Sequence, residues 1–215
     1  MRRAGALAVG CMLCCLALAA GAQEKWLMWS AEKAQATGQA AYVQGRVGGL
    51  FDTRLLKTDR SYNYKLAATW LTPDVIRATA RLTQLSERLS DEGARALVTA
   101  AQGVDGTVVL VEIDPREGSG VIPNDWSAFL QPIATGQAGS AVRGINSPAL
   151  RDVKALAGVR RRNYDYDRFW VVFPWKQADG SATIPAGTRE VELVVRIHDR
   201  EGKVRWNAPA NIAMP

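Results

Sequence analysis

Hydrophobic residues follow a two-residue period in several parts of the chain, which predicts β-strands. Positions 62–70 alternate, with Leu66, Ala68 and Trp70 on one face, and indicate a strand with one buried face. Positions 107–113 are β-branched and almost wholly apolar, as in an interior strand. Positions 169–175, 191–197 and 203–206 predict three further strands that form an antiparallel meander. Its last turn is expected at 199–202, with Gly202 in a left-handed conformation.

A helical pattern occupies positions 72–102. Thr72 is expected to cap the first helix and Pro73 suits its first turn. The first helix then carries one apolar stripe, made by Val75, Ala78, Leu82, Leu85 and Leu89. Ser90 is expected to start a second helix that ends at Gly103.

Three other segments have weaker patterns. Positions 23–60 are expected to form an extended N-terminal segment, in which 31–41 is compatible with a short helix and 41–47 with a strand. Positions 114–150 are rich in loop-forming residues, with a short helix expected over 126–130. Positions 150–159 are expected to form another short helix or a turn.

These elements together predict an α+β fold. We expect an antiparallel sheet or sandwich that carries the two-helix unit of residues 72–102 on one side, with an immunoglobulin-like C-terminal meander as one form of it. Residues 61–215 are expected to be a single domain, because no repeat or interdomain linker interrupts them.

The N-terminus has the three parts of a secretory signal peptide. Arg2 and Arg3 precede an uncharged apolar stretch over 4–19, and Ala20 and Ala22 supply the small residues that signal peptidase requires. We expect residues 1–22 to be removed and the protein to be secreted or periplasmic in a bacterium. The alternatives are an uncleaved membrane anchor and a lipoprotein that is lipidated at Cys11.

The composition of the mature chain excludes several chemistries. All three cysteines lie within the signal, and one histidine is present, so the usual zinc, copper and haem sites cannot form. No nucleotide-binding or serine-hydrolase motif occurs, and His198 is expected to be an exposed turn residue. Two of the 27 basic residues lie in the signal, which leaves 25 against 21 acidic residues. This mild charge does not favour a nucleic-acid partner, and we expect no cofactor and no transmembrane helix in the mature chain.

Carboxylates and a tryptophan follow the predicted interior strand. A carboxylate pair at a strand end is suited to general acid–base hydrolysis of a glycan, with the tryptophan as a platform on which a sugar ring stacks. The simpler interpretation is that acidic residues end a strand because the chain turns into water there. The catalytic candidates are Glu112, Asp114, Glu117 and Asp125, and the stacking candidate is Trp126.

Positions 160–168 form a second candidate site, in which three arginines run into alternating tyrosines and aspartates. The arginines are suited to a phosphate or an anionic polymer, and the aspartates to calcium. The simpler interpretation is a solvated strand edge with internal ion pairs between arginine and aspartate. The binding candidates are Arg160, Arg161, Arg162, Tyr164 and Tyr166, and the calcium candidates are Asp165 and Asp167.

The sequence favours an exported, non-catalytic module that binds a partner protein or a glycan of the cell envelope. Two alternatives remain open at this point. One is a carboxylate-based hydrolase that acts on envelope carbohydrate, and the other is a calcium- or polyanion-binding surface at 160–167.

Overall fold

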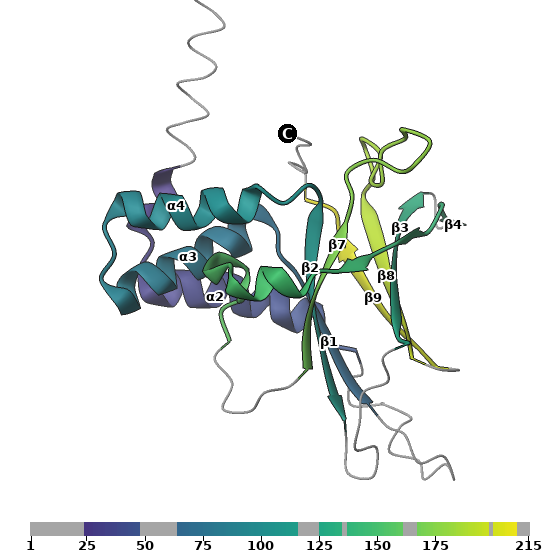
Figure 1. Ribbon diagram of the computed structural model, residues 1–215, viewed down its shortest axis with the longest axis horizontal. Coiled ribbons are helices and arrows are strands. Elements are labelled where there is room, and N and C mark those ends of the chain that lie inside the picture. The colour runs from purple at the N-terminus through teal and green to yellow at the C-terminus, as the bar shows by residue number, and fades with distance from the viewer. Residues whose placement is uncertain are drawn as a thin grey trace, which may run out of the picture.

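The computed structural model describes residues 24–47, 64–115, 125–134, 137–160, 167–197 and 200–209, which form three layers (Figure 1). The strands are β1 (Tyr64–Trp70), β2 (Thr107–Pro115), β3 (Ser127–Ala134), β4 (Gln137–Ala138), β5 (Val142–Arg143), β6 (Ile145–Asn146), β7 (Asp167–Phe173), β8 (Glu190–Ile197) and β9 (Arg200–Asn207). The helices are α2 (Ala31–Gln44), α3 (Pro73–Glu87) and α4 (Asp91–Gln102), with the short 3-10 turns η1 (Lys25–Met28), η3 (Pro148–Asp152) and η4 (Lys154–Leu156).

The strands form two antiparallel sheets that pack face to face. The middle sheet has the order β1-β2-β7-β6, and the outer sheet has the order β4-β3-β8-β9 with β5 also paired to β3. The helices cover the other side of the middle sheet (Figure 1). The predicted α+β fold, with antiparallel sheets and a helical unit, is therefore confirmed.

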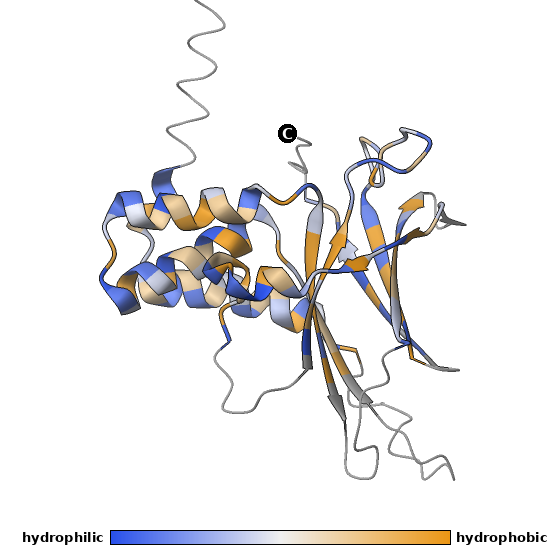
Figure 2. Cartoon of the chain, in the orientation of Figure 1, coloured by the Kyte–Doolittle hydropathy of each residue, from blue (hydrophilic) through white to orange (hydrophobic). Residues whose placement is uncertain are grey.

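The middle sheet is hydrophobic on both faces because it is covered on both sides. On β2, Val109 and Val111 face the outer sheet, whereas Val108 and Leu110 face the helices. The strands of this sheet accordingly carry orange stretches in Figure 2. The prediction that 62–70 has one buried face is wrong for the described strand β1, since Thr69 on its other face is also buried.

The helix signals between 72 and 103 are confirmed. The Val75 N–H donates to Thr72 Oγ1 at 3.5 Å, and the Gly93 N–H donates to Ser90 Oγ at 3.1 Å, so both predicted residues cap their helices. The predicted apolar stripe is only partly buried, because Leu85 is 43% exposed. Helix α3 runs away from the sheet, and its C-terminal part lies toward the outer end of the helical layer (Figure 1).

The short helix considered for 31–41 is present, whereas the extended conformation expected for 23–60 and the strand expected at 41–47 are wrong for residues 24–47. Fourteen residues form α2, which Ser30 caps by accepting from the Lys33 N–H at 3.2 Å. Alanine and glutamine are good helix formers, and α2 packs on α3, which outweighs the helix-weakening effect of Gly38. Within 41–47, an isolated β-bridge joins Arg46 to Ala67 of β1.

The short helix expected over 126–130 is also wrong, because β3 begins at Ser127. Its residues alternate between the core and the outer face, and Pro132 lies within it. The Ala128 and Pro132 carbonyls accept from Gly144 and Gly139, so even-numbered residues of β3 point their backbone groups away from β8. Proline lacks an N–H, but here that group would face the interrupted edge formed by β4 and β5. The turn expected at 150–159 is present as η3 and η4.

The C-terminal strands connect differently from the predicted meander. Strand β7 pairs with β2 in the middle sheet, and only β8 and β9 form a hairpin. Gly202 pairs with Val195 inside β9 and does not have a left-handed conformation. A Cβ at Gly202 would lie 2.5 Å from Leu66 Cδ2, so this glycine permits close packing between the two sheets.

No helix in the described part of the chain is both long and apolar enough to span a bilayer. The predicted signal peptide, residues 1–22, lies outside the described residues.

Candidate functional site

A groove of about 900 Å³ opens between the helical layer and the chain that leads from η4 toward β7. The lining residues within the described ranges come from four parts of the fold and include two arginines and no acidic residue. They are Ala31 and Gln35 of α2; Thr79, Leu82, Thr83, Leu85 and Ser86 of α3; Ala157, Gly158, Val159 and Arg160; and Arg168 of β7.

Segment 157–160 forms one wall of the groove and is held against the helices and the middle sheet. Trp170 Nε1 donates to the Leu156 carbonyl oxygen at 2.8 Å, directly before this segment. Gly158 has a φ of 72°, a left-handed conformation that glycine adopts without strain. Val159 then packs on Gly38 of α2, where a side chain would leave no room for it. The wall therefore depends on two glycines that are far apart in the sequence.

Arg168 brings a guanidinium group to this wall. It lies opposite Glu112 on the side of the middle sheet that faces the helices, and its Nε is 3.7 Å from Glu112 Oε1. Its Nη2 donates to the Ala157 carbonyl oxygen, and its guanidinium lies 5.5 Å from the centre of the Trp170 ring. Glu112 is 4% exposed, and a carboxylate this deeply buried needs a nearby cation. Glu112 therefore anchors Arg168 in place.

Arg160 supplies the second guanidinium at the end of the same wall. The guanidinium lies over the ring of Tyr42 in α2, 4.0 Å from the ring centre, which is cation–π geometry. Arginine presents a planar fork of N–H donors that matches a carboxylate or a phosphate. The stacked ring limits the rotamers of Arg160, so less conformational entropy is lost when an anion binds.

The hydroxyl groups on α3 face the groove as hydrogen-bond acceptors. Thr79 Oγ1 donates to the Val75 carbonyl oxygen at 2.9 Å, and Thr83 Oγ1 donates to the Thr79 carbonyl oxygen at 3.0 Å. Ser86 Oγ likewise donates to the Thr83 carbonyl oxygen at 3.1 Å. Because each hydroxyl hydrogen is used within the helix, the oxygen lone pairs are what each group offers to a ligand.

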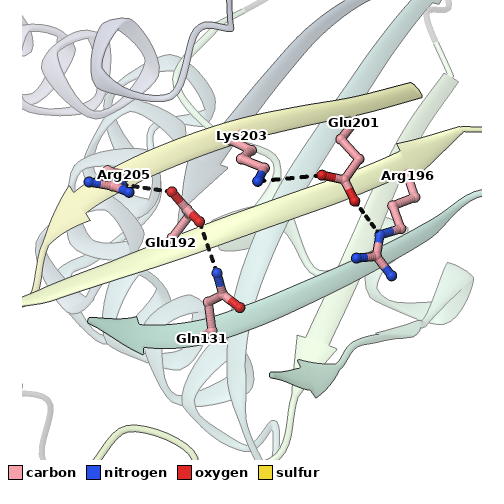
Figure 3. A network of polar contacts seen from close by, with 6 residues as sticks. All are labelled: Gln131, Glu192, Arg196, Glu201, Lys203 and Arg205. Carbon is pink, nitrogen blue, oxygen red and sulfur yellow. Dashed lines mark hydrogen bonds and ion pairs between the residues drawn. The ribbon is translucent and has the colours of Figure 1, made fainter. Parts of the chain in front are cut away.

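A second charged surface lies on the outer face of the outer sheet (Figure 3). Glu192 is 5% exposed there, and it accepts from Gln131 Nε2 at 2.8 Å and from Arg205 Nε at 2.7 Å. Burial raises the pKa of Glu192, but hydrogen bonds from Arg205 and Gln131 and the positive charges of Arg205 and Lys203 together outweigh it and leave the pKa below the ordinary value.

Glu201 continues this row of cross-strand contacts. It accepts from Arg196 Nε at 2.6 Å, and Lys203 Nζ lies 3.4 Å away. The hydrogen bond from Arg196 is the main cause that lowers the pKa of Glu201. Arg196 also lies over the ring of Phe129, 5.0 Å from its centre. Glu192 and Glu201 both have cationic partners within the sheet, so this network stabilises strand pairing and is a weaker candidate for ligand binding than the groove.

The structure places two of the predicted site residues at the groove. Arg160 lines it, and Glu112 lies behind Arg168. Asp125 is exposed directly before β3 of the outer sheet, away from the helix-facing side on which Glu112 lies. Trp126 is partly buried, with its ring centre 4.6 Å from that of Phe169.

The other predicted site residues cannot be placed as side chains. For Asp114 and Asp167 the structure describes the backbone, in β2 opposite Lys65 and in β7 opposite Ile113. The remainder lie outside the described residues: Glu117, Arg161, Arg162, Tyr164, Asp165, Tyr166 and His198. In the part of the chain that the structure describes, no three His, Cys, Asp or Glu residues are grouped as metal ligands.

The sequence did not identify the polar residues of α3 that line the groove as site residues. Their spacing is a usable signal, since Thr79, Thr83 and Ser86 are separated by four and three positions and therefore share one face of a helix. Arg168 ends the predicted stretch 160–168, but its role and that of Tyr42 depend on contacts between distant segments and have no local signal.

Comparison of the chain with protein-family models, curated proteins and solved structures returned no match. The fold and the groove thus define the protein only as a three-layer α+β protein with a basic groove at the margin of its helical layer.

Proposed function

We propose that this protein is an exported, non-catalytic binding module of the bacterial cell envelope, and that it binds a partner protein or a glycan in the groove. The observation that carries the proposal is the lining of the groove. Among the residues that the structure describes, it combines two guanidinium groups, a row of hydroxyl oxygens and an exposed leucine, without an acidic residue. Such a surface is suited to an anionic partner, and its described lining offers no carboxylate for acid–base chemistry.

The positions of the candidate carboxylates favour binding over hydrolysis. Of the four candidates, the side chains of Glu112 and Asp125 are described. Glu112 lies in β2, is deeply buried and pairs with Arg168, whereas Asp125 is exposed and precedes β3 of the outer sheet. A glycosidase needs two carboxyl groups on either side of one bond, and a carboxylate held in a buried ion pair is poorly suited to either role.

The exported location is part of the proposal and rests on the N-terminal pattern of residues 1–22. It directs the search for a ligand to envelope polymers and to proteins that are exposed outside the cytoplasm.

The proposal is tested with purified protein, isolated cell-wall sacculi and a phage-displayed library of 12-residue peptides. We expect the protein to be retained on sacculi or to select peptides, to lose this binding when Arg160→Ala is introduced, and to release no soluble sugar fragments. Arg151→Ala is the matched control, because Arg151 is an exposed cation that does not line the groove. Release of sugar fragments, or the absence of Arg160-dependent binding to any peptide or glycan that is tested, would overturn the proposal.

A further inference from the structure

We infer that the groove binds a peptide segment that combines an acidic group with a bulky apolar side chain. This inference rests on the proposed function and narrows its two ligand classes to one. It follows from three properties of the groove, which are its charge, its exposed leucine and the lack of an aromatic ring among the lining residues that the structure describes.

The charge of the groove selects for an anion. Arg160 and Arg168 both contribute to the lining, and Glu112, which pairs with Arg168, lies behind the wall. Arg160 is stacked on Tyr42, so its guanidinium is already oriented for a bidentate contact with a carboxylate. An aspartate, a glutamate or a C-terminal carboxylate of a peptide supplies this group.

The leucine selects for an apolar side chain beside that anion. Leu85 is 43% exposed and belongs to a small set of large hydrophobic residues that the described chain leaves open to solvent. The others are Met28, Val43 and Ile145, which do not line the groove. Leu82 is partly buried beside Leu85, and the two leucines form an apolar strip that a ligand side chain would cover.

The chemistry of the remaining lining favours a peptide over a glycan. No lining residue that the structure describes carries an aromatic ring on which the face of a sugar could stack, and the ring of Trp126 packs against Phe169. The hydroxyl oxygens of Thr83 and Ser86 act as acceptors, which suits the N–H groups along a peptide backbone. A sugar polymer also lacks the bulky apolar side chain that the two leucines would accommodate.

The test measures which peptides the intact protein selects and how their binding depends on the groove. Peptides selected from the displayed library are sequenced, and one is synthesised with a fluorophore for anisotropy titration. We expect the selected peptides to combine Asp or Glu with Leu, Ile, Met or Phe. Arg160→Ala should weaken binding about tenfold, the loss of one charge-assisted contact. Leu85→Ser should weaken binding about fivefold through lost apolar burial.

Two matched variants control for general effects on charge and hydrophobicity. Arg151→Ala removes an exposed cation, and Ile145→Ser removes an exposed apolar side chain, both outside the groove. Both should change the dissociation constant less than twofold. Arg160→Lys, which keeps the charge but loses the planar fork, should bind between wild type and Arg160→Ala.

Hyaluronate, an acidic glycan without apolar side chains, separates failure of the inference from failure of the proposed function. Arg160-dependent binding of hyaluronate without binding of any peptide overturns the inference and leaves the proposed function standing. Selected peptides that lack acidic or apolar residues, or that bind equally to Leu85→Ser, also overturn it. Binding of neither peptides, hyaluronate nor sacculi overturns both.

Discussion

Adding one methyl group at Gly38 is expected to destabilise the protein, although alanine is the better helix former. In a helix interior, alanine is favoured over glycine by about 1 kcal/mol. A Cβ at Gly38, however, would lie 2.1 Å and 2.4 Å from the two γ-carbons of Val159 and 2.8 Å from its Cβ. Ordinary carbon–carbon contacts are about 3.5–4.0 Å, so segment 157–160 would have to move away from α2.

The expected change in the free energy of unfolding follows from two opposing effects, the gain in helix propensity and the overpacking against Val159. Valine is short and stiff at χ1, so a rotamer change cannot relieve a contact that includes its Cβ. Overpacking of this kind costs up to about 3 kcal/mol, and subtracting the gain in helix propensity leaves a net loss of about 2 kcal/mol for Gly38→Ala. Val159→Ala removes both γ-carbons and should cost about 1 kcal/mol by itself.

Urea denaturation, followed by tryptophan fluorescence, measures the coupling between positions 38 and 159. It is carried out on wild type, Gly38→Ala, Val159→Ala and the double variant. In the double variant, the cost of Gly38→Ala should fall, with a coupling free energy of about 1–2 kcal/mol. Gly93→Ala is the matched control in α4, where the nearest atom to an added Cβ is Leu89 Cβ at 3.4 Å. This control should stabilise the protein by about 0.5 kcal/mol.

The reasoning is refuted if Gly38→Ala stabilises the protein as Gly93→Ala does, or if the two changes at 38 and 159 are additive. Either result would mean that segment 157–160 is not packed on α2, and the wall that carries Arg160 would then be wrongly placed.

Three further predictions concern the sheets. Because the pKa of Glu192 is lowered in the folded state, its charge stabilises the fold above about pH 5, and this contribution is lost as the pH falls further. The difference in melting temperature between wild type and Glu192→Gln should therefore shrink from pH 7 to pH 3. A difference that stays constant over this range would contradict the prediction. Trp70→Phe should cost about 2 kcal/mol in urea denaturation, because Trp70 Nε1 donates to Thr107 Oγ1 at 2.7 Å inside the core; a loss below about 0.5 kcal/mol would show that the bond contributes little. Gly202→Val should also cost about 2 kcal/mol by the same assay, despite the strand preference of valine, because the added Cβ meets Leu66; a neutral result would place Gly202 outside the packed strand.

Local signals in the sequence predicted local structure well. Thr72 and Ser90 cap their helices as expected, because a cap depends on a side chain and a backbone N–H two or three residues later. In β8, the residues Val191, Leu193, Val195 and Ile197 share the inner face as the two-residue period predicts, and the outer face carries Glu192, Val194 and Arg196. For the helix caps and for β8, the contacts that fix the structure follow the spacing of residues along a single element.

Long-range pairing was not predictable in the same way. Strand β7 is apolar on both faces, which agrees with an interior strand, but nothing in its pattern specifies β2 as its neighbour instead of β8. Strand β3 contains Pro132, which has no N–H to donate and is tolerated because its backbone faces the edge formed by β4 and β5. Gly202 was interpreted as a turn residue because a glycine near a hairpin end has the same sequence signal whether it turns the chain or permits close packing.

The sequence predicted separate residues of the candidate site but not that they lie close together in the fold. Arg160 and Glu112 were selected from separate segments and for different reasons, as an anion-binding residue and as a catalytic acid. In the structure, Arg168 connects them by pairing with Glu112 and reaching the wall that ends in Arg160. The role of Glu112 changes accordingly. It was a candidate catalytic acid, and in the structure it is the buried partner of Arg168, which faces the groove.

The position of this ion pair explains why the groove forms where it does. Along the helix-facing side of β2, Val108 and Leu110 are covered by the helical layer, and the next residue on that side is Glu112. On β7, Val172 and Trp170 are followed on the same side by Arg168. The change from apolar to charged residues on both strands marks the margin of the helical cover. A buried carboxylate at such a margin requires a cation, and that cation can also face the adjoining groove, so the packing of the middle sheet itself supplies a positively charged wall.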